Sequence, residues 1–182
     1  HKIGSVGTPA GIVEVKIAAA DGREAAPGES GEILIRGPNV MKGYFGKPKE
    51  TARVLQNGWL RSGDIGLLDD EGYLSIVDRI KDLIISGGLN VYPSEVEETL
   101  YTHPAVEECA VVGIPHAEYG EAVTAFVKRR EGQACTEAEL IAHCKDQVAS
   151  YKAPKQIQFV AELPKSPAGK ILKREIRKNL PG

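Results

Sequence analysis

Alternation of apolar and polar residues is the main pattern in the first half of the chain, and it predicts β-strands. Residues 12–17 read IVEVKI, and residues 31–37 read GEILIRG, in which Ile33 and Ile35 are two positions apart. Gly-containing turns separate the two runs. A period of two residues with turns between the runs is typical of strands that bury one face.

One short helix and a further strand complete this half. Residues 47–56, KPKETARVLQ, predict a helix with Pro48 near its first turn, and the Asn57-Gly58 turn ends it. Residues 73–77 predict another strand. Several short strands with one small helix indicate an antiparallel barrel-like or bent sheet over about residues 1–78.

The second half mixes helical and strand patterns. A helix is predicted from Pro93, with acidic residues in its first turn and with Val96 and Leu100 on one face. Apolar runs at residues 106–114 and 123–127 predict two strands.

Three further elements follow. Thr136 to Glu139 form a capping box before a helix in which Leu140, Cys144 and Val148 repeat every four residues. Residues 156–160 predict a strand, and Leu172, Ile176 and Leu180 mark a terminal helix with a basic outer face. The fold class predicted for the whole chain is therefore α+β, with a β-rich first part and a compact α+β second part.

Charge and cysteine content narrow the functional classes. The net charge of 182 residues is only −2, so no strong overall field favours nucleic acid or an anionic membrane. Beyond Tyr151 and Phe159, the basic tail lacks the interleaved aromatic residues of a nucleic-acid site. Three cysteines without paired spacing argue against a disulfide framework or a metal site, and a reducing cytoplasm is the expected location. No apolar run is long enough for a transmembrane segment.

Four segments together resemble the adenylate-forming acyl-CoA synthetases. They are GEILIRGPNVMKGYFGKPKETA at residues 31–52, GWLRSGDIG at 58–66, DRIKDLIISGGLNVYPSEVE at 78–97 and LPKSPAGKILKRE at 163–175. The resemblance implies that residues 1–80 end a large N-terminal AMP-binding domain. It also implies that residues 81–182 form a mobile C-terminal lid domain.

The resemblance assigns nucleotide contacts to the first part. Asp64 matches the aspartate that binds the ribose hydroxyls, although a lone Ser-Gly-Asp sequence more often caps its own turn. Arg79 matches a second contact to ribose and phosphate; its alternative is an ion pair with Asp78 or Asp82. Ile76 is assigned a place beside the nucleoside, whereas a strand isoleucine is usually part of the core.

The resemblance also assigns roles near the joint between the two parts. Lys81 and Asp82 match the hinge about which the C-terminal domain rotates. Without the resemblance, Asp82 would be only an exposed polar residue before a strand. Gly87 and Gly88 match the loop that lines the channel for the coenzyme A arm. A plain hairpin turn would use the same glycines.

Two lysines complete the predicted site. Lys170 matches the lysine that the family brings to the α-phosphate during adenylation, where an ammonium group stabilises developing negative charge. Ala168 stands where many relatives have Ser or Thr, a difference that we do not expect to matter. Lys152 is a candidate contact to coenzyme A phosphates, but its basic face could equally be solvated.

The implied reaction converts a carboxylic acid, with a fatty acid as first guess, to an acyl-adenylate and then to an acyl-CoA. Its substrates are ATP with Mg²⁺, the acid and coenzyme A. No Gly/Ser/Thr-rich phosphate loop or acyl pocket is found, so we expect this chain to be a C-terminal piece that needs an N-terminal domain and is inactive alone. The alternatives are transfer to a carrier protein, and a non-catalytic module that retains the motifs.

Overall fold

Two compact units make up the computed structural model, which describes residues 2–178. The first unit spans residues 1–81 and the second spans residues 82–182, so they meet one residue after the predicted boundary. Each unit contains its own β-sheet. The predicted α+β class is confirmed, with a curled antiparallel sheet in the first unit and a helix-covered sheet in the second.

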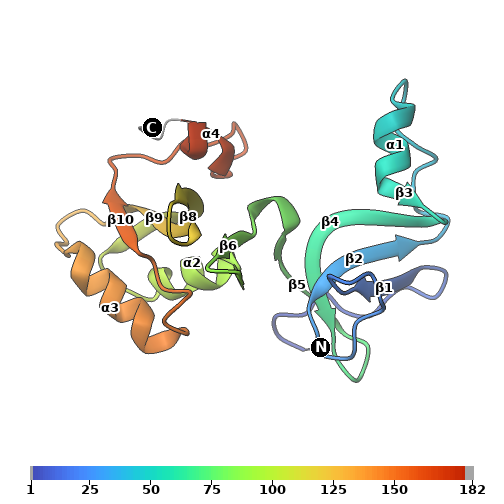
Figure 1. Cartoon of the computed structure of the whole chain (residues 1–182), viewed down its shortest axis with the longest axis horizontal. Helices are drawn as coiled ribbons and strands as arrows, with labels where there is room; N and C mark the ends of the chain where they lie inside the picture. Colours follow the sequence, from blue (N-terminus) through green and yellow to red (C-terminus); the bar gives the residue numbers. More distant parts are fainter. Residues whose placement is uncertain (1, 179–182) are drawn as a thin grey trace. The chain divides into compact units, whose positions relative to one another are not determined.

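The first unit is built on a five-stranded antiparallel sheet (Figure 1). Its strands are β1 (Glu14–Ala18), β2 (Gly31–Arg36), β3 (Leu55–Gln56), β4 (Trp59–Leu68) and β5 (Leu74–Arg79). The long strand β4 pairs with β2 along one edge and with β3 and β5 along the other. It therefore holds the sheet together and bends along its length.

The helix predicted at residues 47–56 is shorter than expected. Helix α1 spans Pro48–Val54, and the next two residues form strand β3. Asn57 and Gly58 have φ values of 52° and 80°, which is the left-handed pair that a tight hairpin turn requires. The turn thus returns the chain into β4, and pairing with β4 prevails over the helical pattern of the last two residues.

Burial along β2 does not follow the expected alternation of Ile33 and Ile35. Glu32, Ile33 and Leu34 are consecutive, and they are 8%, 3% and 9% exposed. The register between β2 and β4 shifts at this point, between Glu32 and Leu34. An irregular ladder of this kind turns neighbouring side chains in new directions, and here it buries a carboxylate.

The second unit contains a five-stranded sheet with one parallel pair. Its strands are β6 (Ile84–Ser86), β7 (Leu89–Val91), β8 (Val106–His116), β9 (Gly120–Arg129) and β10 (Gln156–Phe159). The hairpin of β8 and β9 is longer than the two predicted strands. Its central strand β9 pairs with β8 on one side and with β10 and β6 on the other.

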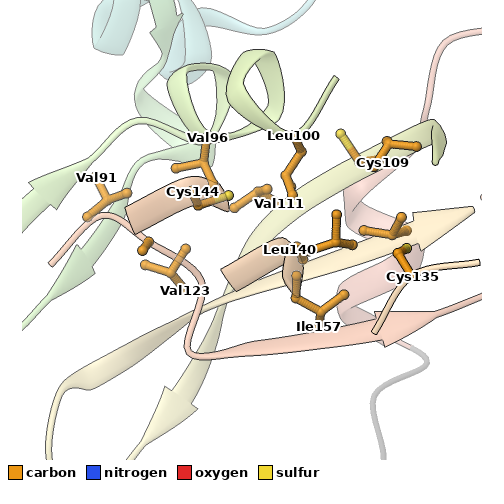
Figure 2. Close-up of a cluster of buried hydrophobic side chains, with 14 of the residues drawn as sticks. Val91, Val96, Leu100, Cys109, Val111, Val123, Cys135, Leu140, Cys144 and Ile157 are labelled. Carbon is orange, nitrogen blue, oxygen red and sulfur yellow. The ribbon is translucent and has the colours of Figure 1, made fainter. Parts of the chain in front are cut away.

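Helices α2 (Pro93–Tyr101) and α3 (Glu137–Gln147) pack against this sheet around an apolar core (Figure 2). Val96, Leu100 and Cys144 are fully buried there, as the helical spacing predicted. The capping box is confirmed, because Thr136 Oγ1 accepts a hydrogen bond from Glu139 N at 3.2 Å while Glu139 Oε2 accepts one from Thr136 N at 2.7 Å. Val148, expected inside α3, lies just beyond its end.

The C-terminal segment covers the opposite face of the same sheet. Strand β8 sends Ala110 and Val112 into a second apolar cluster, which includes Leu163 and Ile176 from the C-terminal segment. Helix α4 spans Lys173–Lys178, and Leu180, predicted to belong to it, lies outside the described residues. This packing anchors the loop that carries Lys170 to β8. None of the described helices is long and apolar enough to cross a bilayer.

Candidate functional site

Asp64 and Arg79 face each other across two neighbouring strands of the first unit. Asp64 lies in β4 and pairs in register with Arg79 at the end of β5. Arg79 Nε is 3.4 Å from Asp64 Oδ1, and the two side chains are 58% and 35% exposed. An ion pair this exposed contributes little to stability, so ligand hydroxyls could replace it at small cost.

A bulge in β4 sets the position of Asp64, which was expected in a turn. Glu32 pairs with Ile65 and Leu34 pairs with Arg61, so three residues of β4 stand opposite one residue of β2. Gly63 in this bulge has φ of 76°, a value that favours glycine.

Two polar contacts support the backbone within the bulge. Asp64 N donates to Ser62 Oγ at 3.0 Å, and Gly63 N donates to Glu32 Oε1 at 3.3 Å. Glu32 also forms an ion pair with Arg61. The turn-like geometry expected around Asp64 therefore occurs inside a strand.

An open hollow of about 600 Å³ lies over this bulge. Its lining residues are Glu32, Arg61, Ser62, Gly63, Asp64, Arg79, Ile80 and Lys81. The hollow combines carboxylates that can accept hydrogen bonds from hydroxyl groups with guanidinium groups that can donate to phosphate oxygens. Such a set of groups suits a ribose bearing a phosphate.

Ile76 stands apart from this hollow. It lies on β5 opposite Gly66, it is 53% exposed, and it is not among the residues that line the hollow. The alternative prediction, that Ile76 is part of the core, is wrong because this residue is exposed. Its predicted contact with a nucleoside stays a prediction.

Lys81 and Asp82 lie at the boundary of the two units, in the short 3₁₀-helix η1 (Ile80–Asp82). Asp82 was expected to be freely exposed, but its side chain is only 15% exposed and pairs with Arg177 of helix α4 at 3.2 Å. The side chain of Asp82 is thereby attached to the second unit.

Gly87 and Gly88 form the tip of the hairpin between β6 and β7. Their φ values are 59° and 78°, and no atom lies within 4 Å of the position that a Cβ would take on either residue. Gly87 N donates to Tyr119 O at 2.8 Å, which ties the tip to the loop between β8 and β9. The predicted hairpin is confirmed, and its open surface leaves room for a ligand.

Lys170 lies in a tight turn before helix α4. Ser166 N donates to Lys170 O at 2.8 Å, and Lys170 N donates to Ser166 Oγ at 3.2 Å, so the backbone is held on both sides. The side chain is exposed, and within residues 2–178 its Nζ has no hydrogen-bond or ion-pair partner. The turn therefore presents an unneutralised ammonium group.

Lys152, in contrast, is already paired. Its Nζ lies 2.7 Å and 2.8 Å from the two carboxylate oxygens of Glu95 in the first turn of α2. These hydrogen bonds raise the pKa of Lys152. A phosphate contact would have to displace Glu95, so the predicted role in binding coenzyme A stays a prediction.

The structure thus brings Asp64 and Arg79 together in one unit and places Gly87, Gly88, Lys152 and Lys170 in the other. Among the described residues, no three His, Cys, Asp or Glu side chains are grouped so that they could hold a metal ion. The three cysteines are buried and free.

Two family models match this chain. The model of the AMP-binding enzyme matches residues 1–45, and the model of the AMP-binding enzyme C-terminal domain matches residues 95–170. The chain belongs to the AMP-binding enzyme family. The predicted resemblance is confirmed, including its assignment to the C-terminal part of such enzymes.

Several of the relatives that this chain resembles are CoA ligases by name. A feruloyl-CoA synthase of Amycolatopsis sp is 49% identical over 98% of this chain and 36% of its own length. A long-chain-fatty-acid–CoA ligase of Bacillus subtilis is 49% identical over 97% of this chain and 32% of its own length. The chain therefore spans about a third of the relatives that it matches.

A solved structure from the same family agrees closely with this one. The o-succinylbenzoate CoA synthetase of Bacillus subtilis, in complex with its acyl-adenylate intermediate, superposes with a TM-score of 0.89. It is 41% identical, and the match covers 97% of this chain and 36% of that chain.

Glu32 and Arg61 are two residues of the hollow that the sequence motifs did not single out. Glu32 lies within the apolar run of β2, where a charged residue among buried neighbours was an available signal. Arg61 directly precedes the Ser62-Gly63-Asp64 segment. Their pairing depends on the bulge between β2 and β4, which no local pattern indicated.

Proposed function

We propose that this chain is the C-terminal third of an ATP-dependent acyl-CoA ligase. The complete enzyme would join a carboxylic acid to AMP with release of pyrophosphate, and then transfer the acyl group to coenzyme A with release of AMP. The observation that carries the proposal is the Asp64–Arg79 pair at the hollow over β4. Its groups match the hydroxyls and phosphate of a nucleotide.

In this proposal Lys170 acts in the first step. Its ammonium group is exposed and has no partner among residues 2–178. It would approach the carboxylate and the α-phosphate and stabilise the negative charge that develops there. The backbone hydrogen bonds of its turn would limit the conformational freedom lost on binding. ATP would enter as its Mg²⁺ complex.

The second step would use the open tip at Gly87 and Gly88. Rotation of the second unit about Lys81 and Asp82 would withdraw Lys170 and admit the coenzyme A thiol past these glycines. The relatives have about two thirds of their length outside the part that this chain matches. The corresponding part of the complete enzyme would supply the acyl pocket. A fatty acid is our proposed substrate, although the relatives by name act on ferulate, long-chain fatty acids and o-succinylbenzoate.

Replacing Lys170 by Ala in the full-length protein that contains this chain tests the proposal. Acid-dependent exchange of pyrophosphate into ATP should fall about 100- to 1,000-fold, because one aimed charge is removed. Thioester formation from supplied acyl-adenylate should change far less. Lys145→Ala, at an exposed position of α3, is the matched control and should leave both steps unchanged.

A panel of aromatic, medium-chain and long-chain acids gives the substrate class in the same assay. The absence of exchange with every acid would contradict the proposed ligase. Normal exchange by Lys170→Ala would remove Lys170 from its assigned role. Preference for an aromatic acid would contradict only the fatty-acid part of the proposal.

A further inference from the structure

We propose that Glu32 is a positioning residue for the nucleotide, acting through the bulge that presents Asp64. This inference rests on the proposed function of Asp64 as a ribose contact. Glu32 lies on the neighbouring strand β2 and lines the same hollow. Neither its role nor that of Arg61 follows from the motif that contains Asp64.

The burial of Glu32 first indicates a specific role. Its residue exposure is 8%, and among the described residues the other buried polar side chains are Ser86, Thr99 and Thr124. A carboxylate is expensive to bury unless a cation and hydrogen-bond donors compensate for its lost hydration. Glu32 has both, because its two oxygens contact the Arg61 guanidinium and the Gly63 amide.

The position of these two contacts indicates which part of the chain Glu32 supports. Arg61 and Gly63 lie on β4 just before Asp64, in and beside the stretch where three residues oppose one residue of β2. A bulge leaves backbone groups without ladder partners, and a buried amide without an acceptor is costly. Glu32 accepts the hydrogen bond of the Gly63 amide and draws Arg61 to the same point, so it holds the backbone on which Asp64 is mounted.

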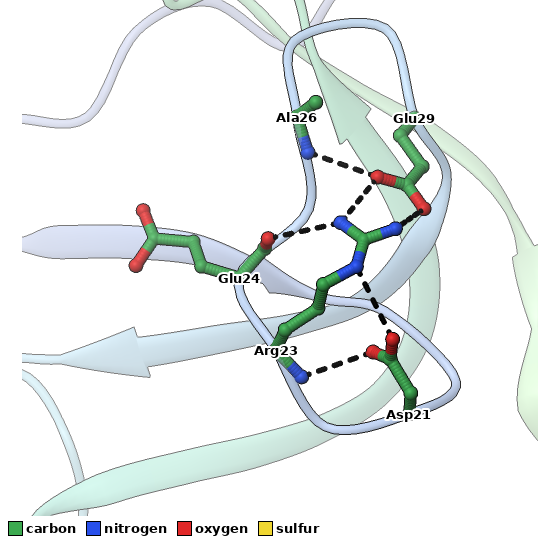
Figure 3. Close-up of polar contacts among 5 residues, drawn as sticks. All are labelled: Asp21, Arg23, Glu24, Ala26 and Glu29. Carbon is green, nitrogen blue, oxygen red and sulfur yellow. Dashed lines mark hydrogen bonds and ion pairs between the residues drawn. The ribbon is translucent and has the colours of Figure 1, made fainter.

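Another carboxylate in the same unit makes equivalent contacts away from this site. Glu29 pairs with Arg23 and accepts a hydrogen bond from Ala26 N at 3.0 Å in the loop between β1 and β2 (Figure 3). Its side chain is 36% exposed, whereas that of Glu32 is 9% exposed. Glu29 is therefore a matched control for the loss of one carboxylate that bridges an arginine and a backbone amide.

The test compares Glu32→Gln with Glu29→Gln in the full-length protein. Glutamine keeps the shape and one acceptor oxygen but loses the charge that pairs with Arg61. We expect Glu32→Gln to raise the KM for ATP about tenfold, the effect of losing one charge-assisted hydrogen bond. The KM for the carboxylic acid and the melting temperature should stay close to those of the parent protein. Glu29→Gln should leave both KM values unchanged.

Arg61→Gln provides a second route if Glu32→Gln fails to fold. Its replacement leaves the buried Glu32 carboxylate without its cation, but that carboxylate keeps the hydrogen bond from Gly63 N. It should raise the KM for ATP in the same direction, and the effects of the two substitutions should be less than additive in the double variant, because both break one interaction. Fully additive effects would overturn the inference.

Asp64→Ala separates this inference from the function on which it rests. If Asp64→Ala raises the KM for ATP and Glu32→Gln does not, the role of Glu32 is wrong and the nucleotide site stands. If Asp64→Ala also leaves the KM for ATP unchanged, the proposed nucleotide site is itself wrong. An equal rise in both KM values for Glu32→Gln would indicate a general structural role and would also overturn the inference.

Discussion

Three lysines of the C-terminal segment, at positions 165, 170 and 173, differ in whether an acidic side chain pairs with them. Lys165 pairs with Glu108, and Lys173 pairs with Glu97 at 2.8 Å, both across to other elements of the second unit. Lys170 stands between them with no such partner among the described residues. The outer two lysines fasten the C-terminal segment, which leaves Lys170 as the group whose charge is available to a ligand.

The thiol of Cys109 differs from an ordinary cysteine thiol in its burial and its pKa. Cys109 is 2% exposed, and its Sγ donates to Glu97 O at 3.6 Å. Burial, reinforced by the charge of Glu97, raises the pKa of Cys109 from 9.0 to about 12. The folded protein therefore holds this proton more tightly than the unfolded chain does. The resulting stabilisation is complete below about pH 9 and is lost as pH rises toward 12.

We therefore expect Cys109 to resist alkylation in the native protein at pH 8. A shift of about three units leaves on the order of 1,000-fold less thiolate than an ordinary thiol, and burial further restricts access. Iodoacetamide labelling followed by mass spectrometry measures this directly. The same labelling in urea is the control, where Cys109 should react fully; rapid native labelling would contradict the buried environment.

Among the elements, the hairpin of β6 and β7 is anchored by the buried residues Ile84 and Val91 but has a short ladder with β9. In the part of the chain that the structure describes, the ladder between β6 and β9 consists of the pair Ser86–Gly120. A side chain adds to this, because Ile85 N donates to Glu121 Oε2 at 2.8 Å. Gly113 on β8 leaves the space that the Glu121 carboxylate occupies, since an added Cβ would lie 2.8 Å from it. The position of the Gly87-Gly88 tip thus depends on a glycine in another strand.

Gly113→Ala should loosen this hairpin. The new methyl group would displace the Glu121 carboxylate and break its bond to Ile85, while the sheet could stay intact because a flexible side chain absorbs the clash. In the full-length protein we expect thioester formation from acyl-adenylate to slow about two- to tenfold, the range for one lost hydrogen bond, with adenylation unchanged.

Gly11→Ala is the control for this substitution. No atom lies within 4 Å of the position that a Cβ would take on Gly11, and its φ is not in the left-handed region. It should therefore leave both half-reactions unchanged. Equal slowing of adenylation and thioester formation by Gly113→Ala would show that the effect is not confined to the hairpin.

At the scale of the whole molecule, the joint between the units is narrow in sequence. The first unit ends at Lys81 and the second begins at Asp82. The side chain of Asp82 forms an ion pair with Arg177 of the second unit. If the units rotate as we propose, the change must be absorbed by backbone torsions at Lys81 and at the start of Asp82. A hinge needs such freedom and no particular functional group.

Lys81→Pro should therefore impair the enzyme without unfolding either unit. Proline fixes φ near −65° and restricts the preceding residue as well. We expect single-turnover measurements on the full-length protein to show at least one half-reaction slowed about tenfold or more, and their ratio changed. Lys81→Ala, which removes the side chain and keeps the torsional freedom, should preserve the ratio. Parent-like rates in both half-reactions for Lys81→Pro would contradict the hinge.

Much of the fold was predictable from local sequence. The capping box at Thr136, the buried face of Val96 and Leu100, and the hairpin at Gly87-Gly88 all formed as predicted. Each depends on residues within a few positions of one another, and their conformational preferences act before any distant contact forms. The predicted end of α1 was wrong, because pairing with β4 outweighed the helical preference of Leu55 and Gln56.

The chain by itself determined its strands, turns and caps, its family and the identity of Asp64, Arg79 and Lys170 as candidates, because these are properties of short segments. Only the tertiary structure decided which charges meet. Asp64 stands opposite Arg79, and Glu32 reaches Arg61 across 29 positions of sequence, because the bulge in β4 sets the register. Register is a long-range property, in which a shift of one residue redirects every side chain that follows.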